Sequence, residues 1–306
     1  MLRGAYSHTN YFNKLFILIA LVFSLLLFST LFGILILVPF YGSGILGLLT
    51  TPDYSDASVI SAMKVIQILN MAGGLLLPAL IYLWLCTPVD ESIKKNGRNT
   101  APLAVLWSVI LIVIAQPLIG FANEVNSFLQ LPQWLSFVEE WMKNAERQGE
   151  LITDAFLSTT TASGLLLNIF MIAVLPAFTE EFLFRGVLAR LFSDWTKSKH
   201  LAVFISSLIF AAIHLQFYGF LPRFLLGMAM GYLFFWSGSL WLPITAHFTN
   251  NFLSVMVEFL YRRGLTGTNA ESFGLDNAAW MTGISIVSVS FMMYYIHRIT
   301  TVQPVK

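Results

Sequence analysis

Apolar residues occur in long runs along this chain, and short polar segments separate the runs. Eight runs approach the roughly 20 apolar residues that a membrane-spanning helix needs. They cover residues 15–40, 65–86, 103–122, 165–185, 201–217, 221–236, 240–261 and 278–296. The pattern predicts an all-α fold, a polytopic transmembrane helix bundle of about eight spans.

The composition agrees with a membrane environment. Hydrophobic residues make up 57% of the chain and charged residues 11%, with a mean hydropathy of +0.75. A soluble domain carries about 25% charged residues. No polar linker divides the sequence, so residues 1–306 are expected to form a single integral membrane domain in contact with membrane lipids. The net charge of +1 offers no basic surface for a nucleic acid, and the single cysteine excludes an internal disulfide.

One polar segment, 123–162, is longer than the others and contains LPQWLSFVEEWMKNAERQ. Its apolar residues, among them Trp134, Phe137 and Trp141, recur at helical spacing, while charged residues fill the opposite face. This pattern predicts a short amphipathic helix that lies in the membrane interface. Two roles remain open for it: an anchor on the membrane surface, or a gate for a substrate.

The basic residues predict the orientation, because cytoplasmic loops are enriched in Lys and Arg. With the N-terminus inside, eleven basic residues fall on the inner side: Arg3, Lys14, Lys94, Lys95, Arg98, Arg185, Arg190, Lys197, Lys199, Arg298 and Lys306. Six fall on the outer side: Lys64, Lys143, Arg147, Arg223, Arg262 and Arg263. The imbalance predicts that both termini are cytoplasmic.

Three charged residues interrupt the fourth run, in the stretch PAFTEEFLFRGVL. A charge inside a span costs about 2.5–3.5 kcal/mol on insertion scales, so such residues are rare and mostly functional. Glu181 and Arg185 are four residues apart and can form an ion pair on one helix face. Glu180 has no such local partner, which suits a general base of tunable pKa. The alternative is that both glutamates have only a structural role, in contacts between neighbouring helices.

Two histidines, His214 and His247, also lie within predicted spans. His247 and Asn251 are four residues apart on one helix face, so both side chains can donate hydrogen bonds toward a developing oxyanion. Asn250 is the weaker candidate for this role, and a structural hydrogen bond between helices is its alternative. Together with Glu180, these residues form a candidate hydrolytic centre.

The same residues carry a family resemblance. EEFLFR, FAAIH and HFTNN, within residues 180–251, have the forms EExxxR, FxxxH and HxxxN. In that order, on successive spans, they resemble the CAAX-protease and bacteriocin-processing (CPBP/Abi) family of intramembrane endopeptidases, which includes the Ras-converting CAAX endopeptidase. The resemblance covers about residues 165–260, the expected catalytic core. Residues 1–164, the N-terminal spans and the outer loop, lie outside it.

The resemblance implies a role for each motif residue. Glu180, assisted by His214, would activate water, and His247 with Asn251 would stabilise the oxyanion. Glu181 and Arg185 would orient the site as a buried ion pair. The implied function is hydrolysis of a peptide bond in a membrane-associated protein or peptide.

The metal dependence of this chemistry has two readings. The family is described as metalloprotease, and a zinc ion would take Glu180, His214 and His247 as ligands. However, no HExxH pattern is present, and the four polar residues already form a complete water-activating and oxyanion-binding set. Metal-independent hydrolysis is therefore preferred here over a zinc cofactor.

Two other functions compete with the protease. One is a proton-coupled transporter, since buried Glu and His residues also suit a proton relay. The first three spans hold no counterpart of the EExxxR motif or of the mid-span histidines, so no inverted repeat supports that function. The other is a non-catalytic immunity or scaffold membrane protein. The resemblance favours a prokaryotic plasma membrane, and the sequence specifies neither the substrate nor a need for prenylation.

Convergence of the candidate residues requires a particular helix geometry. Glu180 lies near the inner end of its predicted span, whereas His214 lies about 21 Å beyond His200 at 1.5 Å per residue. The two can meet if the fourth helix continues inward past Arg185, which the sequence GVLARLF permits, or if the fifth begins well outside the bilayer. We expect a water-filled cavity that opens to the cytoplasm, on the same face as the termini.

Overall fold

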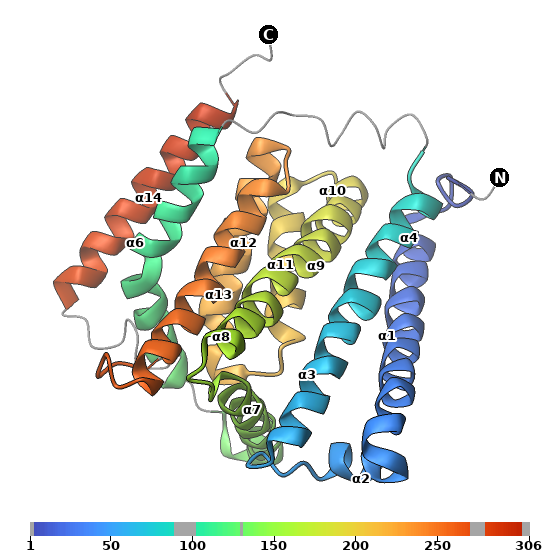
Figure 1. Ribbon diagram of the computed structural model, residues 1–306. Coiled ribbons are helices and arrows are strands. Elements are labelled where there is room, and N and C mark those ends of the chain that lie inside the picture. Colours follow the sequence, from blue (N-terminus) through green and yellow to red (C-terminus); the bar gives the residue numbers. More distant parts are fainter. Residues whose placement is uncertain (1–2, 89–101, 129–130, 270–278, 302–306) are drawn as a thin grey trace.

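The computed structural model describes residues 3–88, 102–128, 131–269 and 279–301. Helices account for all the regular secondary structure in these ranges, and no strand occurs in them. Figure 1 shows a bundle in which α1, α3 and α4 form one edge and α6 and α14 the other. The predicted all-α bundle is confirmed.

The first edge of the bundle depends on a close approach between helices. Its helices are α1 (Tyr11–Tyr41), α2 (Ile45–Thr50), α3 (Ala57–Met71) and α4 (Leu77–Cys86), with a π-helical turn (Ala72–Leu76) joining α3 to α4. Gly73, in that turn, lies against Ser29 of α1. A Cβ atom at Gly73 would stand 1.8 Å from the Ser29 hydroxyl oxygen, so only glycine permits this packing.

The rest of the bundle includes one helical stretch that changes its winding twice. α8 (Ala162–Asn168), α9 (Leu175–Glu181) and α10 (Arg190–Thr196) follow one another through π-helical segments at Ile169–Val174 and Phe182–Ala189. The other helices are α6 (Pro102–Ser127), α7 (Ser136–Leu157), α11 (Lys199–Ala212), α12 (Phe220–Ser237), α13 (Trp241–Arg262) and α14 (Ala279–Thr301).

Each of the eight predicted spans corresponds to helical structure, but the count of eight is not met. In the part of the chain that the structure describes, six helical stretches are both long and apolar enough to cross a membrane. The fifth run forms α11, which has only 14 residues. The seventh forms α13, which has 22 residues but carries His247, Asn250 and Asn251. α11 is therefore too short, and α13 not apolar enough, to be counted among the six.

Two apolar clusters lie on either side of the central helices. One joins α1, α4, the Phe182–Ala189 segment and α11, and the other joins α6, α12, α13 and α14. α9 belongs to neither cluster. The amphipathic helix predicted in the long polar segment is confirmed as α7, which lies at the end of the bundle away from the start of α1 (Figure 1).

Candidate active site

A buried network joins α9 to α13. Arg185 and Glu181 are 1% and 0% exposed, and the Arg185 Nη1 donates to Glu181 Oε1 over 2.8 Å. The ion pair expected from their four-residue spacing is therefore present. The Arg185 Nη2 also donates to the carbonyl oxygen of Gly227 (2.9 Å), and the guanidinium stacks over the Phe210 ring at 4.9 Å. These contacts compensate the cost of burying the arginine.

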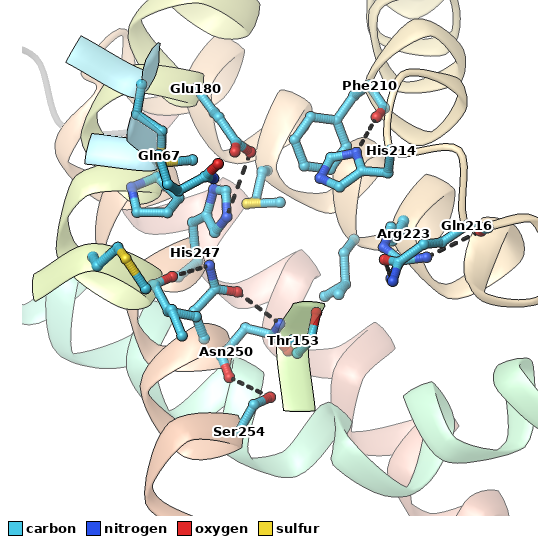
Figure 2. A pocket seen from close by; sticks show the side chains of 18 of the residues that line it. Gln67, Thr153, Glu180, Phe210, His214, Gln216, Arg223, His247, Asn250 and Ser254 are labelled. Atoms are coloured by element: carbon cyan, nitrogen blue, oxygen red, sulfur yellow. Dashed lines mark hydrogen bonds and ion pairs between the residues drawn. The ribbon is translucent and has the colours of Figure 1, made fainter. Parts of the chain in front are cut away.

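The same carboxylate orients His247. His247 Nδ1 donates to Glu181 Oε1 over 2.9 Å, which leaves Nε2 as the free ring nitrogen. That nitrogen lies 3.9 Å from Glu180 Oε2, too far for a direct hydrogen bond. Glu180 is 7% exposed, and its Oε2 has no hydrogen-bond partner among the described residues. A carboxylate and an imidazole nitrogen thus face each other across a short gap (Figure 2).

His214 enters the site from the turn that follows α11. Its Nδ1 donates to the carbonyl oxygen of Phe210 over 2.6 Å, so Nε2 is a free acceptor on this ring as well. The next residue, Leu215, has a positive φ of 54°, a conformation that non-glycine residues rarely adopt. Figure 2 shows His214 across the cavity from Glu180 and His247.

The lengths of their helices explain how Glu180, His214 and His247 come to lie at the same depth in the bundle. The helical stretch with Glu180 continues to Thr196, as expected, which places Glu180 about 24 Å from that end at 1.5 Å per residue. His214 lies about 22 Å from the start of α11 by the same measure. His247 reaches the same level from α13, since its Nε2 lies 3.9 Å from Glu180 Oε2.

Asn251 has a different partner from the one expected. Its Nδ2 donates to the carbonyl oxygen of Ile172 over 3.0 Å. Pro176 has no N–H group, so the α-helical donor to this carbonyl is missing. Asn250 lies beside it and donates from Nδ2 to Asn251 Oδ1 over 3.3 Å. The bond between helices that the sequence analysis considered for Asn250 is thus made by Asn251.

The four candidate residues Glu180, His214, His247 and Asn251 line one cavity of about 450 Å³, the Glu180 cavity. This volume is typical of ligand sites. A second cavity of about 600 Å³, here the α7 vestibule, is lined in part by Glu146, Glu150 and Asp154 of α7. Three residues line both cavities: Thr153, Gln216 and Arg223.

The position of the vestibule corrects one prediction. The Glu180 cavity continues toward α7, at the end of the bundle opposite the start of α1 and the end of α14 (Figure 1). The expected opening to the cytoplasm and the expected cytoplasmic termini therefore do not hold together. The reason is that the hydrophobic pattern does not show which helix borders the cavity, and Ile152, Thr153 and Phe156 of α7 line it.

Several lining residues were not identified from the sequence. Gln67 of α3 and Arg223 of α12 line the Glu180 cavity, and both are polar residues inside apolar runs, the same signal that identified Glu180. Arg223 Nη1 donates to the carbonyl oxygen of Gln216 over 3.1 Å, and its Nη2 donates to the side-chain oxygen of Gln216. This clamp holds the loop that carries His214.

The donor groups do not fit a three-ligand zinc site. Among the described residues, no group of three or more His, Cys, Asp or Glu side chains is close enough to hold a metal ion. The set Glu180, His214 and His247, considered above as zinc ligands, therefore lines one cavity without forming a ligand cluster. Structural and catalytic zinc sites use three or four protein ligands at about 2.0–2.3 Å.

Comparisons with known proteins agree with the motifs. Residues 162–253 match the family model described as type II CAAX prenyl endopeptidase Rce1-like. The matched segment contains all three motifs and runs from the start of α8 into α13, which confirms the family resemblance for this core. A stretch of 85 residues is 35% identical to "Uncharacterized protein YpbD" of Bacillus subtilis (strain 168). It covers 26% of this chain and 40% of that relative. No solved structure matches.

Proposed function

We propose, from an Rce1-like core within a membrane-spanning bundle, that this protein is an intramembrane endopeptidase. It hydrolyses a peptide bond of a membrane-associated protein or peptide. The observation that carries the proposal is the gap of 3.9 Å between Glu180 Oε2 and His247 Nε2 at the wall of a cavity. A buried carboxylate oxygen without a protein partner is expensive, and a reacting water molecule is the partner that a hydrolase provides.

In this mechanism Glu180 is the general base. Its carboxylate removes a proton from a water molecule, and the resulting hydroxide attacks the carbonyl carbon of the scissile bond. His214 assists, because its Nδ1–H is bonded to Phe210 and its Nε2 lone pair accepts a hydrogen bond from the same water. Glu180 then transfers the proton to the leaving amine as the carbon–nitrogen bond breaks. One water is consumed for each bond cleaved.

His247 and Asn251 stabilise the negative charge of the tetrahedral intermediate by hydrogen bonds. Protonated His247 donates from Nε2 to the oxyanion while its Nδ1–H remains bonded to Glu181. The second N–H of the Asn251 amide is available, since one N–H serves Ile172. Arg185 is a positioning residue: it fixes the Glu181 carboxylate and, through it, the His247 ring.

The test compares proteomes of cells that contain the wild type or Glu180→Gln. Glu180→Gln removes the base with little change of shape, so the substrate should accumulate as an uncleaved precursor. Glu139→Gln, the same chemical change on α7 outside both cavities, is the matched control and should accumulate none. If the wild-type and Glu180→Gln proteomes show the same processed products, the protein is not a Glu180-dependent protease.

A further inference from the structure

Gln67 is a polar residue within an apolar helical stretch. The stretch Ala57–Cys86, which comprises α3, the π-helical turn and α4, is long and apolar enough to cross a membrane. Asn70, three residues further along α3, accepts a hydrogen bond from Thr30 of α1. The Gln67 carboxamide has no such bond among the residues that the structure describes. Because an unsatisfied amide is costly inside a bilayer, its place in α3 points to a functional role.

The side chain of Gln67 lies on the face of α3 that borders the Glu180 cavity. Lys64, Gln67 and Met71 share this face, since they are three and four residues apart. Met71 lines the cavity together with Gln67. Lys64 donates over 3.0 Å to the carbonyl oxygen of Phe156, which is another lining residue. Figure 2 shows Gln67 among the side chains that surround the cavity, as it does Glu180.

The wall of the cavity next to α3 is apolar. α3 packs against α9 and the π-helical segment before it, which contribute Met171, Ile172 and Pro176 to the lining. None of these three side chains carries an N–H group or an oxygen, and the carbonyl oxygen of Ile172 already accepts from Asn251. The Gln67 carboxamide therefore presents both its N–H donors and its oxygen to the cavity.

From these observations we infer that Gln67 is a substrate-binding residue, whose carboxamide binds the main chain of the polypeptide next to the scissile bond. The inference rests on the proposed function and adds a residue of α3, outside the three motifs, to the site. A peptide group has one N–H donor and one carbonyl acceptor, and a carboxamide can complement both. Main-chain groups inside a helix are already bonded to one another. The substrate segment that Gln67 binds is therefore unwound and independent of any particular side chain.

The first measurement compares Gln67→Leu with Gln116→Leu. Both changes remove a carboxamide from an apolar helix at nearly constant size. Gln116 of α6 lines neither the Glu180 cavity nor the α7 vestibule, and it donates to the carbonyl oxygen of Ile112 in its own helix, so it is the matched control. Precursor accumulation in cells and the unfolding temperature in detergent are measured for both variants and for Glu180→Gln.

We expect Gln67→Leu to accumulate the precursor that Glu180→Gln accumulates, without a lower unfolding temperature, because it loses no hydrogen bond within the described part of the protein. Gln116→Leu should accumulate none. Wild-type processing by Gln67→Leu, or accumulation accompanied by a lower unfolding temperature, would overturn the inference. If Glu180→Gln itself accumulates no precursor, the proposed function fails and the role of Gln67 fails with it.

The second measurement uses a synthetic peptide that spans the cleavage site of that precursor. Gln67→Leu should raise KM by about tenfold and leave kcat nearly unchanged, as expected for the loss of one or two neutral hydrogen bonds in binding. Single peptide groups of the substrate are then replaced by esters, which lack the N–H donor. At one position the ester should raise KM for the wild type and not further for Gln67→Leu, since the two changes remove the same contact. A lower kcat at constant KM, or equal ester effects in both proteins at every position, would overturn main-chain binding.

Discussion

His247 Nδ1 lies 2.9 Å from Glu181 Oε1, and this bond links α13 to the ion pair between Glu181 of α9 and Arg185 of the Phe182–Ala189 segment. Because one ring nitrogen is committed to Glu181, the other is aimed at Glu180. In the proposed mechanism, the second glutamate of the motif is therefore the orienting carboxylate, and the first is the base. The predictions below follow from this division of roles.

Glu181→Gln should impair both folding and catalysis. The substitution leaves Arg185 buried without its anion, and breaking a buried pair costs about 3–5 kcal/mol. Glu180→Gln should leave thermal stability in detergent close to that of the wild type, because Glu180 Oε2 has no protein hydrogen bond to lose. Thermal unfolding of both variants, side by side, checks the contrast. Equal loss of stability in the two would contradict the separate roles.

Asn251→Ala should destabilise the protein more than Asn250→Ala. The first change leaves the carbonyl oxygen of Ile172 without its side-chain donor, next to Pro176, and an unsatisfied buried group costs about 1–3 kcal/mol. The second removes only a longer bond to Asn251 Oδ1. The measurement is the unfolding midpoint together with kcat. An Asn250→Ala variant that is the less stable of the two would show that the bond from Asn251 to Ile172 is unimportant.

Arg223→Gln should lower kcat more than it raises KM, because the clamp on Gln216 positions the loop that carries His214. Arg223→Lys should restore activity only in part, since an ammonium cannot present the planar fork that serves two acceptors. A loss of about tenfold corresponds to about 1.4 kcal/mol in the barrier. Arg263→Gln, at an exposed position directly after α13, is the control and should change neither kcat nor KM.

Gly73→Ala should loosen the edge formed by α1 and α3. The added Cβ would stand 1.8 Å from the Ser29 Oγ, so the two helices must separate. Gly283→Ala in α14 is the matched control, because a Cβ there meets nothing within 4 Å. The expected result is a lower unfolding temperature for Gly73→Ala alone. Equal unfolding temperatures would show that this contact is not tight.

Activity should survive exhaustive chelation. The prediction follows from the donor set, since the described residues bring no three His, Cys, Asp or Glu side chains together as ligands. The measurement is the cleavage rate after treatment with a strong zinc chelator, followed by added zinc. Loss of activity on chelation and recovery with zinc would establish a metal-dependent mechanism and replace the one given above.

The sequence predicted the helices and the local pairs well, because both depend on spacing along one helix. The Glu181–Arg185 pair is an example, since four residues form one turn. It did not predict that His247 would share Glu181, which depends on how α13 crosses α9. The π-helical segments on both sides of α9 were also missed, because a change of winding leaves no mark in the hydrophobic pattern.

The orientation of the cavity could not be predicted for a related reason. Depth along a span does not show which other helix borders a cavity. Thr153 of α7 lines the Glu180 cavity, and its place there depends on how α7 packs against the spans. Gln67 and Arg223 were overlooked because no motif includes them, although each is a polar residue in an apolar run.

The most direct test of the central claim is the cleavage rate of a purified membrane-anchored substrate in liposomes, measured in H₂¹⁸O with wild type, Glu180→Gln and Glu139→Gln. The account predicts ¹⁸O in the new carboxylate with wild type and Glu139→Gln, and a rate lower by about 10²–10⁴-fold for Glu180→Gln. Cleavage by Glu180→Gln at the wild-type rate would contradict it.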